Sequence, residues 1–400
     1  MHCSEETRRA LLARMGSMAF ATGATLAVAK KATSATVARN PKTLWSTLLP
    51  DPDAVMVGGT VQGERLRILI DTGSAMTVVD AALAKRLGLA STGARSVRGD
   101  VGSVTLGAGS DLSLDLGGTH FAVERYLVTD FAPIFGADGG SPNVILGIDA
   151  LRDAILAIDF TARRLAFLPR DAFRPWPGAE RFAVTKSLRG QLSLPIVLEG
   201  HDPVAAAIDL GSSNPLTVTP ALAEAQTLMR GRRISSAATG GIDGLSISRT
   251  ISVATLRVGR SLINDVPCEV LAKTDPTLVV AKLGLPVFER FLFALDVAGQ
   301  ALWLKPEARR LATPFRRDLS GLGLAVESGH LRVVHVAQGG PAALAGWREG
   351  EIVVAVDGVP IGPRYASSGL AQWRYGPAGG KAVLSLSDGS TRTLVLRRYY

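Results

Sequence analysis

Cysteine is nearly absent from this sequence, whose 400 residues include only Cys3 and Cys268. Disulfide-rich scaffolds need several cysteine pairs, so that class of fold is excluded. Cys268 lies in an apolar, strand-like stretch, residues 266–272, and we expect it to be a small buried core residue. With 47% hydrophobic residues, a chain of this length can build two or three domains, each with its own core.

The motifs of several hydrolase classes are missing as well. The sequence has no His-Glu-x-x-His, no Gly-x-Ser-x-Gly and no Gly-x-x-x-x-Gly-Lys-Ser/Thr. Zinc peptidases, serine hydrolases and nucleotidases therefore have no support, and we expect no metal or other cofactor. The five histidines are scattered, at His2, His120, His201, His330 and His335.

No apolar run beyond the N-terminus is long enough to cross a bilayer. Near the N-terminus, the pair Arg8-Arg9 precedes an uncharged stretch, residues 15–29, which ends in Ala-Val-Ala. A membrane span needs about 20 residues, so this stretch is short for one. We expect residues 1–29 to be a twin-arginine-type signal peptide that exports the protein to the periplasm or cell envelope. An uncleaved membrane anchor and an ordinary basic N-terminus are the alternatives.

The net charge of +9 is not concentrated in one run. The tightest basic groups, at 230–233, 309–310 and 316–317, fall in expected loops or linkers. We therefore expect a generally basic surface and no nucleic acid partner.

The sequence does contain an internal repeat. Three segments recur at an offset of 137 or 138 residues, which implies two copies of one domain-sized unit. Short β-prone runs and glycine-containing turns predict mostly strand in both copies, with one short helix in each, over 80–87 and 220–229. Asp80 is the expected N-cap of the first helix, and Gly88 follows its end. The matched segments are 68–74 with 206–212, 144–147 with 281–284, and the hairpins 155–168 and 291–304, in which Asp159 is matched with Asp296.

These segments resemble the pepsin/retropepsin superfamily over residues 50–305. The motif Asp-Thr-Gly-Ser stands at 71–74, Asp-Leu-Gly-Ser stands at 209–212, and glycine ends the segments at 144–147 and 281–284. The resemblance implies a mainly β protein with two duplicated retropepsin-like (acid protease) β lobes. Because one chain carries both lobes, a monomer is expected to suffice.

The paired acids account for the chemistry that the resemblance implies. Two close carboxylates cannot both ionise easily, so Asp71 and Asp209 would share one proton, one acting as base towards water and the other as acid. The expected activity is that of an aspartic endopeptidase on proteins or peptides. The residues expected to support the two catalytic loops are Thr72, Gly73, Ser74, Gly211 and Ser212. The glycines expected to give mobility to two flap hairpins, over 96–104 and 237–247, are Gly99, Gly102, Gly240 and Gly241.

Two features bear on activity. A hydroxyl group that donates to a carboxylate favours its charged form, so Ser74 and Ser212 predict an acidic or mildly acidic optimum. Leu210 stands where the family has Thr or Ser, whose hydroxyl braces the opposite loop. This departure leaves an alternative open, a catalytically inactive pseudo-peptidase that binds peptides.

The C-terminal part resembles bacterial PDZ domains. The residues that carry this resemblance are Gly321-Leu322-Gly323-Leu324, Gly340-Pro341-Ala342, Ala345-Gly346, residues 350–353 and Val356-Asp357-Gly358. It implies an extended or C-terminal peptide bound along a sheet edge, with its carboxylate at the amides of 321–324. The alternative is a closed groove that acts only as a brace, and residues 365–380 are expected to be weakly helical.

The predicted organisation is therefore a signal peptide at 1–29, a linker at 30–48, lobe 1 at 49–170, a linker at 171–188, lobe 2 at 189–306, a linker at 307–317 and a PDZ-like domain at 318–400.

Overall fold

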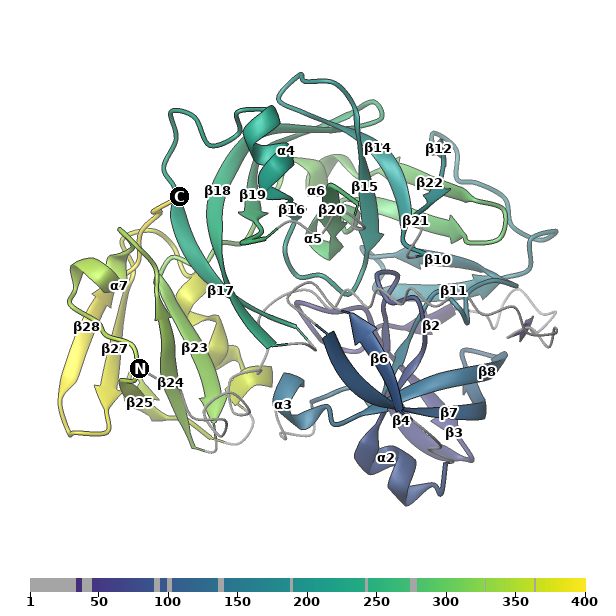
Figure 1. Ribbon diagram of the computed structural model, residues 1–400, viewed down its shortest axis with the longest axis horizontal. Helices are drawn as coiled ribbons and strands as arrows, with labels where there is room; N and C mark the ends of the chain where they lie inside the picture. Colours follow the sequence, from purple (N-terminus) through teal and green to yellow (C-terminus); the bar gives the residue numbers. More distant parts are fainter. Residues whose placement is uncertain are drawn as a thin grey trace.

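The computed structural model describes residues 34–37, 45–89, 94–98, 103–135, 140–187, 190–241, 244–273, 279–327, 329–362 and 365–400. The predicted signal peptide and two of the predicted flap glycines, Gly99 and Gly102, lie outside these ranges. Within them, no helix has the length and apolar character needed to span a bilayer. The protein is mainly β, as predicted, and its strands form four sheets in the described part (Figure 1).

The first sheet has eight described strands, in the order β1-β8-β5-β9-β4-β3-β7-β6. They are β1 (Ser34–Val37), β3 (Met56–Val61), β4 (Glu64–Ile70), β5 (Val78–Asp80), β6 (Ala94–Arg98), β7 (Ser103–Leu116), β8 (Thr119–Thr129) and β9 (Val144–Leu146). Helix α2 (Ala81–Arg86) follows β5, and α3 (Ala132–Phe135) follows β8. The predicted N-cap is confirmed, because the Asp80 carboxylate accepts from the Leu83 N–H at 3.3 Å. Gly88 follows the helix with a φ of +63°.

The second sheet also has eight strands among the described residues, in the order β13-β14-β15-β20-β16-β19-β18-β17. They are β13 (Thr185–Lys186), β14 (Leu192–Leu198), β15 (Val204–Asp209), β16 (Leu216–Val218), β17 (Ser235–Gly241), β18 (Gly244–Val258), β19 (Ser261–Val270) and β20 (Ala281–Gly284). Helix α4 (Pro220–Ala225) is shorter than the predicted 220–229, because Thr227 has a φ of +50° and cannot continue a right-handed helix. Helix α5 (Leu285–Phe288) follows β20.

The centres of these two sheets have the same pairing pattern. In the first, β4 runs parallel to β9, β9 antiparallel to β5, and β5 parallel to β8. In the second, β15, β20, β16 and β19 repeat that sequence of parallel, antiparallel and parallel pairs. Residues 71–74 and 209–212 therefore follow corresponding central strands.

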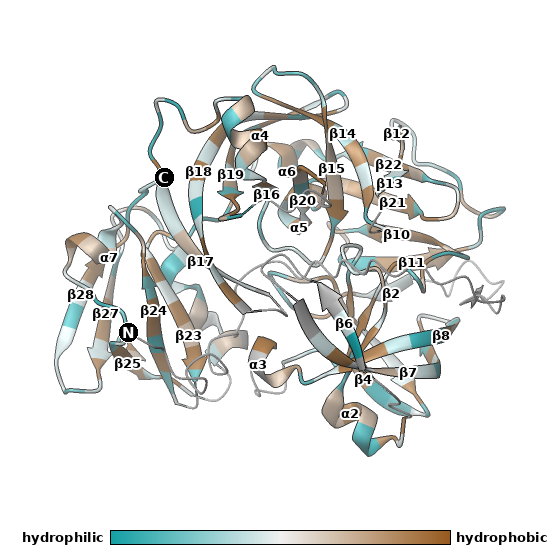
Figure 2. Cartoon of the chain, in the orientation of Figure 1, coloured by the Kyte–Doolittle hydropathy of each residue, from teal (hydrophilic) through white to brown (hydrophobic). Residues whose placement is uncertain are grey.

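A third sheet is shared by both halves, which the predicted lobe boundaries do not anticipate. Its described strands are β12 (Glu180–Ala183), β22 (Ala301–Pro306), β21 (Phe291–Asp296), β10 (Ile155–Asp159), β11 (Arg164–Leu168) and β2 (Trp45–Thr47), in that order. Pairing of β10 with β21 joins the halves, and one hydrophobic cluster extends through both. The ranges predicted as linkers, 30–48 and 171–188, contain strands because open sheet edges need backbone partners. Figure 2 shows hydrophobic residues along β15, β21 and β24, whereas the turns are mostly teal or white.

The C-terminal sheet has a core of its own. Its described strands are β23 (Leu322–Glu327), β24 (His330–Val336), β25 (Ile352–Val356), β26 (Val359–Pro360), β27 (Lys381–Leu386) and β28 (Thr391–Val395). Helix α7 (Pro341–Leu344) follows β24, and the weak helical propensity predicted for 365–380 corresponds to two 3₁₀ helices, η2 (Tyr365–Ser367) and η3 (Gly369–Tyr375).

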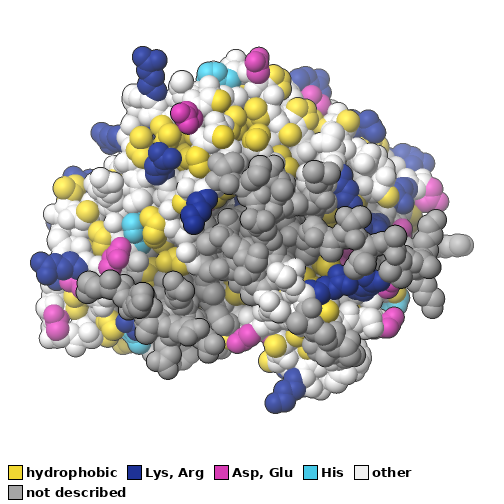
Figure 3. Space-filling view, in the orientation of Figure 1, with side chains coloured by type: hydrophobic (Ala, Val, Ile, Leu, Met, Phe, Trp, Pro, Cys, Tyr) yellow, Lys and Arg dark blue, Asp and Glu magenta, His cyan; other side chains and the backbone are white. Residues whose placement is uncertain are grey.

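The segment predicted as a linker, 307–317, is built into the structure. It contains α6 (Ala308–Ala312), and its last residues bind all three neighbouring parts. Arg316 forms an ion pair with Asp53, and Arg317 forms one with Asp265 at 3.0 Å. Arg316 also donates to Gln372 at 2.6 Å. These arginines therefore hold the C-terminal sheet against the two halves, while Figure 3 shows other Lys and Arg side chains spread over one face of the molecule.

Candidate active site

Two loops with acidic residues interleave where β4 and β15 end. We call residues 71–74 the Asp71 loop and residues 209–212 the Asp209 loop. A Cβ added to Gly73 would lie 2.5 Å from the Asp209 carboxyl carbon, and one added to Gly211 would lie 2.5 Å from an Asp71 carboxylate oxygen. Glycine is thus required at both positions for close approach of the loops. Both acidic side chains are fully buried.

The two loops hold their carboxyl groups in the same way. Oδ1 of Asp71 accepts from the Gly73 N–H at 2.8 Å and the Ser74 N–H at 3.1 Å, and Oδ1 of Asp209 accepts from the Gly211 N–H at 3.0 Å. Burial raises the pKa of Asp71 well above its usual value, and the charge of Asp209 and a hydrogen bond between the two carboxyl groups add to this. These effects raise the pKa of Asp71 by more than the two N–H donors lower it, so the pair of acids is suited to share a proton.

A buried lysine distinguishes the two acids. Lys282 Nζ lies 3.5 Å from Asp209 Oδ2, and its side chain is only 9% exposed. Lys282 is on β20, paired with Ala207 on β15. The corresponding residue of the first sheet is Ile145 on β9, so that position carries no charge beside Asp71. Sequence reasoning missed Lys282, although a lysine inside an otherwise apolar repeat segment was a usable signal.

Thr72 links the two loops on one side. Its hydroxyl donates to the Ile208 carbonyl at 2.9 Å and accepts from the Leu210 N–H at 3.0 Å. The Leu210 side chain is fully buried in the main hydrophobic core. Leu210 therefore cannot form the reciprocal link, but its side chain packs in that core with the neighbouring apolar residues.

The two serines do not act as predicted. The Ser74 hydroxyl donates to the Met76 carbonyl at 2.6 Å, and the Ser212 hydroxyl donates to the Asn214 carbonyl at 3.3 Å. Each hydroxyl satisfies a carbonyl within its own turn, as short polar side chains commonly do. The prediction of an acidic optimum therefore loses its original basis, since the donors to Asp71 are backbone N–H groups.

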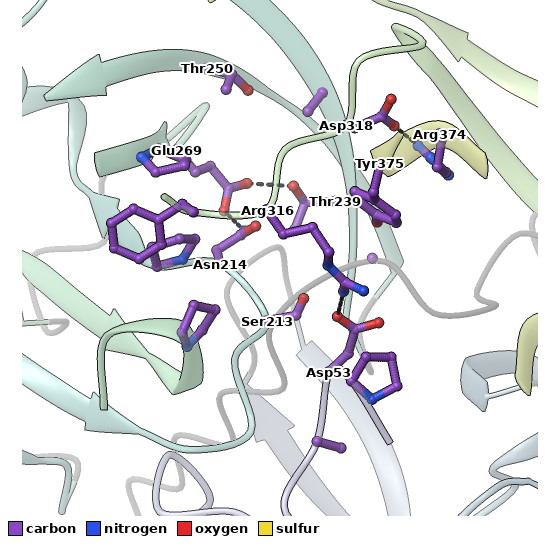
Figure 4. Close-up of a pocket in the computed structure, with 18 of the residues that line it drawn as sticks. Asp53, Ser213, Asn214, Thr239, Thr250, Glu269, Arg316, Asp318, Arg374 and Tyr375 are labelled. Carbon is purple, nitrogen blue, oxygen red and sulfur yellow. Dashed lines mark hydrogen bonds and ion pairs between the residues drawn. The ribbon is translucent and has the colours of Figure 1, made fainter. Parts of the chain in front are cut away.

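A cavity of about 770 Å³ adjoins the Asp209 loop and lies between the two halves and the C-terminal sheet (Figure 4). Its walls come from all three parts of the protein. The residues that matter here are Gly211, Ser213, Asn214, Thr239, Gly240 and Glu269 from the second half, Met56, Leu69, Ile134 and Phe135 from the first, and Gly321, Leu322 and Gly323 from the C-terminal part.

The hairpin predicted as the second flap is held by the C-terminal sheet. β17 and β18 pair up to Gly241 and Gly244, and Gly240 lines the cavity. The Ser236 hydroxyl lies 2.8 Å from His335 Nε2, and the Ser235 hydroxyl donates to the Gln338 carbonyl at 2.8 Å. The hairpin is therefore anchored at the start of its first strand, several residues before the predicted flap glycines Gly240 and Gly241.

The predicted peptide-binding loop, residues 321–324, faces this hairpin. A Cβ on Gly323 would lie 3.3 Å from the Ala238 Cβ. The Leu322 N–H donates to the Ser320 hydroxyl at 3.1 Å, and the Leu322 carbonyl accepts from Arg374 at 2.6 Å. Leu324 is buried in the C-terminal core. In this arrangement Leu322 has both backbone groups bonded within the protein, so a carboxylate could not use that amide without rearrangement.

A buried acid beneath the Asp71 loop gives a test of stability. Burial raises the pKa of Asp149 to about 6, although the Thr77 hydroxyl donates to it at 3.0 Å. Because the pKa of Asp149 is higher in the folded state, the folded protein binds a proton that the unfolded chain has already lost. The free energy of unfolding therefore falls as the pH rises from about 4, the pKa in the unfolded chain, through about 6, the pKa in the folded state. We expect the free energy of unfolding of the wild type, relative to Asp149→Asn, to fall by about 3 kcal/mol over this range.

Urea unfolding at a series of pH values checks this prediction, because Asp71 and all other acids are common to both proteins. Asp115→Asn exchanges an exposed acid for its amide in the same way and is the matched control for the substitution itself. Parallel curves for the wild type and Asp149→Asn would show that Asp149 titrates normally.

A comparison with known protein families gives a match for the first half of the chain, which contains the Asp71 loop. Residues 57–150 match a family model described as aspartyl protease, and this range contains the Asp71 loop but not the Asp209 loop. No curated protein matches the chain. The crystal structure of basic 7S globulin from soybean is similar at 10% identity, over 66% of this chain and 94% of that chain, with a TM-score of 0.41. The family match supports a peptidase at a general level.

Proposed function

We propose that this protein is an aspartic endopeptidase that hydrolyses peptide bonds of protein substrates with Asp71, Asp209 and an activated water. Two duplicated retropepsin-like lobes within one monomer would supply one acid each. The observation that carries the proposal is the interleaving of the two loops, which buries both carboxyl groups together and favours one shared proton.

The buried lysine assigns the roles in the proposed reaction. Lys282 stabilises negative charge on Asp209, so Asp209 takes a proton from the water while the water oxygen bonds to the peptide carbonyl carbon. Asp71, whose pKa is raised, gives its proton to the carbonyl oxygen. When the tetrahedral intermediate collapses, the C–N bond breaks and Asp209 gives its proton to the leaving amine. A hydroxyl group of the intermediate returns its proton to Asp71 as the carbonyl re-forms, so the acids again share one proton.

In the same proposal, the C-terminal sheet is a PDZ-like domain that recruits or positions a substrate or partner protein, and the protein works in the periplasm or cell envelope. Support comes from the cavity, which brings residues 321–323 and the Asp209 loop to one space. The second candidate is an inactive peptide-binding module, motivated by Leu210. The Thr72 link and the position of Leu210 in the core favour the enzyme.

The experiment is incubation of the purified chain with an unfolded protein, in water enriched in ¹⁸O, over a range of pH. We expect fragments whose new carboxyl termini carry the label, and no transfer of the acyl part to added hydroxylamine, because water attacks directly. Peptide binding without cleavage at any pH would favour the inactive module.

A further inference from the structure

Beside the acid pair, one face of the second sheet carries a row of polar side chains. Thr217 on β16 is in register with Lys282 on β20 and with Glu269 on β19, so the three residues lie side by side. Lys282 at one end binds Asp209, and Glu269 at the other end lines the cavity.

The corresponding row of the first sheet is apolar. Val78 on β5 is in register with Ile145 on β9 and Leu127 on β8, and all three are fully buried. They belong to a hydrophobic cluster whose members Met56 and Leu69 reach the cavity. Part of the cavity wall from the first half is therefore apolar, and the second half contributes a buried carboxylate.

Glu269 is surrounded by neutral donors. It is 6% exposed, and its Oε1 accepts from the Thr239 hydroxyl at 2.5 Å. Its Oε2 accepts from the Asn214 amide at 2.6 Å (Figure 4). The same oxygen accepts from the Thr217 hydroxyl at 3.4 Å. No Lys, Arg or His of the described ranges forms an ion pair with Glu269, because its neighbour Lys282 binds Asp209.

The arginines that line the same cavity are already bound. Arg316 pairs with Asp53 and Arg374 with Asp318. Arg290 donates to the backbone carbonyls of residues 310, 311 and 313, and Arg310 donates to those of residues 160 and 289. A buried carboxylate without a cation is costly, so the Glu269 end of the cavity favours a positive ligand.

We infer that Glu269 forms a subsite for a lysine side chain of the substrate peptide, an inference that rests on the proposed function. A carboxylate accepts about four hydrogen bonds, and three come from the protein. The one remaining position on Oε1 suits a single ammonium N–H better than the two-pronged guanidinium of arginine. The apolar wall packs against the methylene stem. Gly211, which lines the cavity and contacts the Asp71 carboxyl group, connects the subsite with the acid pair.

The test uses peptides that place lysine, arginine or norleucine at successive positions around one cleavable bond. At one position we expect kcat/KM with lysine to exceed that with norleucine by about tenfold or more, with arginine between them. Glu269→Gln keeps the size of the side chain. It should bring the ratio of kcat/KM for the lysine peptide to kcat/KM for the norleucine peptide close to one, by lowering only kcat/KM for the lysine peptide. Glu269→Lys should reverse the preference towards a peptide with glutamate at that position.

Thr239→Val is the matched control, since it removes a donor to Glu269 but keeps the carboxylate, and it should retain the preference for lysine. A lysine-to-norleucine ratio that is unchanged in Glu269→Gln overturns the inference, while the norleucine peptide still reports on the peptidase itself. If the wild type cleaves neither peptide, the proposed function fails. Fluorescence anisotropy of the labelled peptides then decides the subsite, because equal affinity for lysine and norleucine peptides overturns it and tighter binding of lysine supports it.

Discussion

Replacing either Asp71 or Asp209 by asparagine is expected to lower kcat/KM by at least about 1000-fold. An amide can neither take the proton from the water nor hold the proton that the pair shares. Asparagine has nearly the same size as aspartate, so the contacts of each carboxyl group with the opposite glycine are kept. Cleavage of an unfolded protein, followed by mass spectrometry, measures the loss.

The double variant is expected to be no worse than either single one, because the two acids act as a unit. Asp159→Asn is the control, since this acid pairs with Arg164 in the shared sheet, away from the loops, and activity should persist. Thermal unfolding of each variant shows whether the fold is kept. Full turnover by a folded Asp71→Asn or Asp209→Asn protein would remove that acid from the mechanism.

Local signals in the sequence were sufficient to place several elements. The helix cap at Asp80, the turn at Gly88 and burial of Cys268 each depend on neighbouring residues and agree with the structure. The repeat offset likewise put Asp71 and Asp209 after corresponding strands, because a repeated pattern of apolar runs and turns specifies a repeated pattern of pairing.

The pairing of strands that are far apart in the chain could not be predicted from the sequence. Strands β12 and β13 lie in a range that reads as a linker, since each is short and gains its stability from partners far away in the chain. The contact of Lys282 with Asp209 similarly depends on the parallel register of β15 and β20, which no local pattern specifies. The acceptor of the Ser74 hydroxyl, the Met76 carbonyl, could not be predicted, because the sequence leaves open whether such a hydroxyl donates to a carboxylate or to a carbonyl of its own turn.

The C-terminal sheet, which resembles PDZ domains in sequence, packs against the β17–β18 hairpin of the second half. One of the residues expected to receive a peptide, Gly323, lies against Ala238 of β17, although its strand β23 is at the edge of the C-terminal sheet. Figure 1 shows this sheet beside the β17–β18 hairpin. A ligand that moves the C-terminal sheet would therefore act on the hairpin through Ser235 and Ser236, and so on the cavity next to the acid pair.

Replacing Lys282 by methionine is expected to move the acid limb of the pH profile of kcat/KM upward by about 1 to 3 pH units. The lysine stabilises negative charge on Asp209, so without it the pair gives up its first proton only at higher pH. The charge of Asp71 on the opposite loop also disfavours ionisation of Asp209, so it acts in the same direction as loss of the lysine. At a fixed pH on this limb the loss is about 10- to 1000-fold, and raising the pH restores activity.

This recovery with pH separates an electrostatic role of Lys282 from a structural one. Lys282→Arg keeps the positive charge and should keep the acid limb close to that of the wild type. Ile145→Met alters the corresponding position of the first sheet, where no ion pair exists, and should leave the profile in place. If Lys282→Met lowered kcat/KM by one factor at every pH, the lysine would only support the fold of β20, and the assignment of Asp209 as base and Asp71 as acid would lose its physical basis.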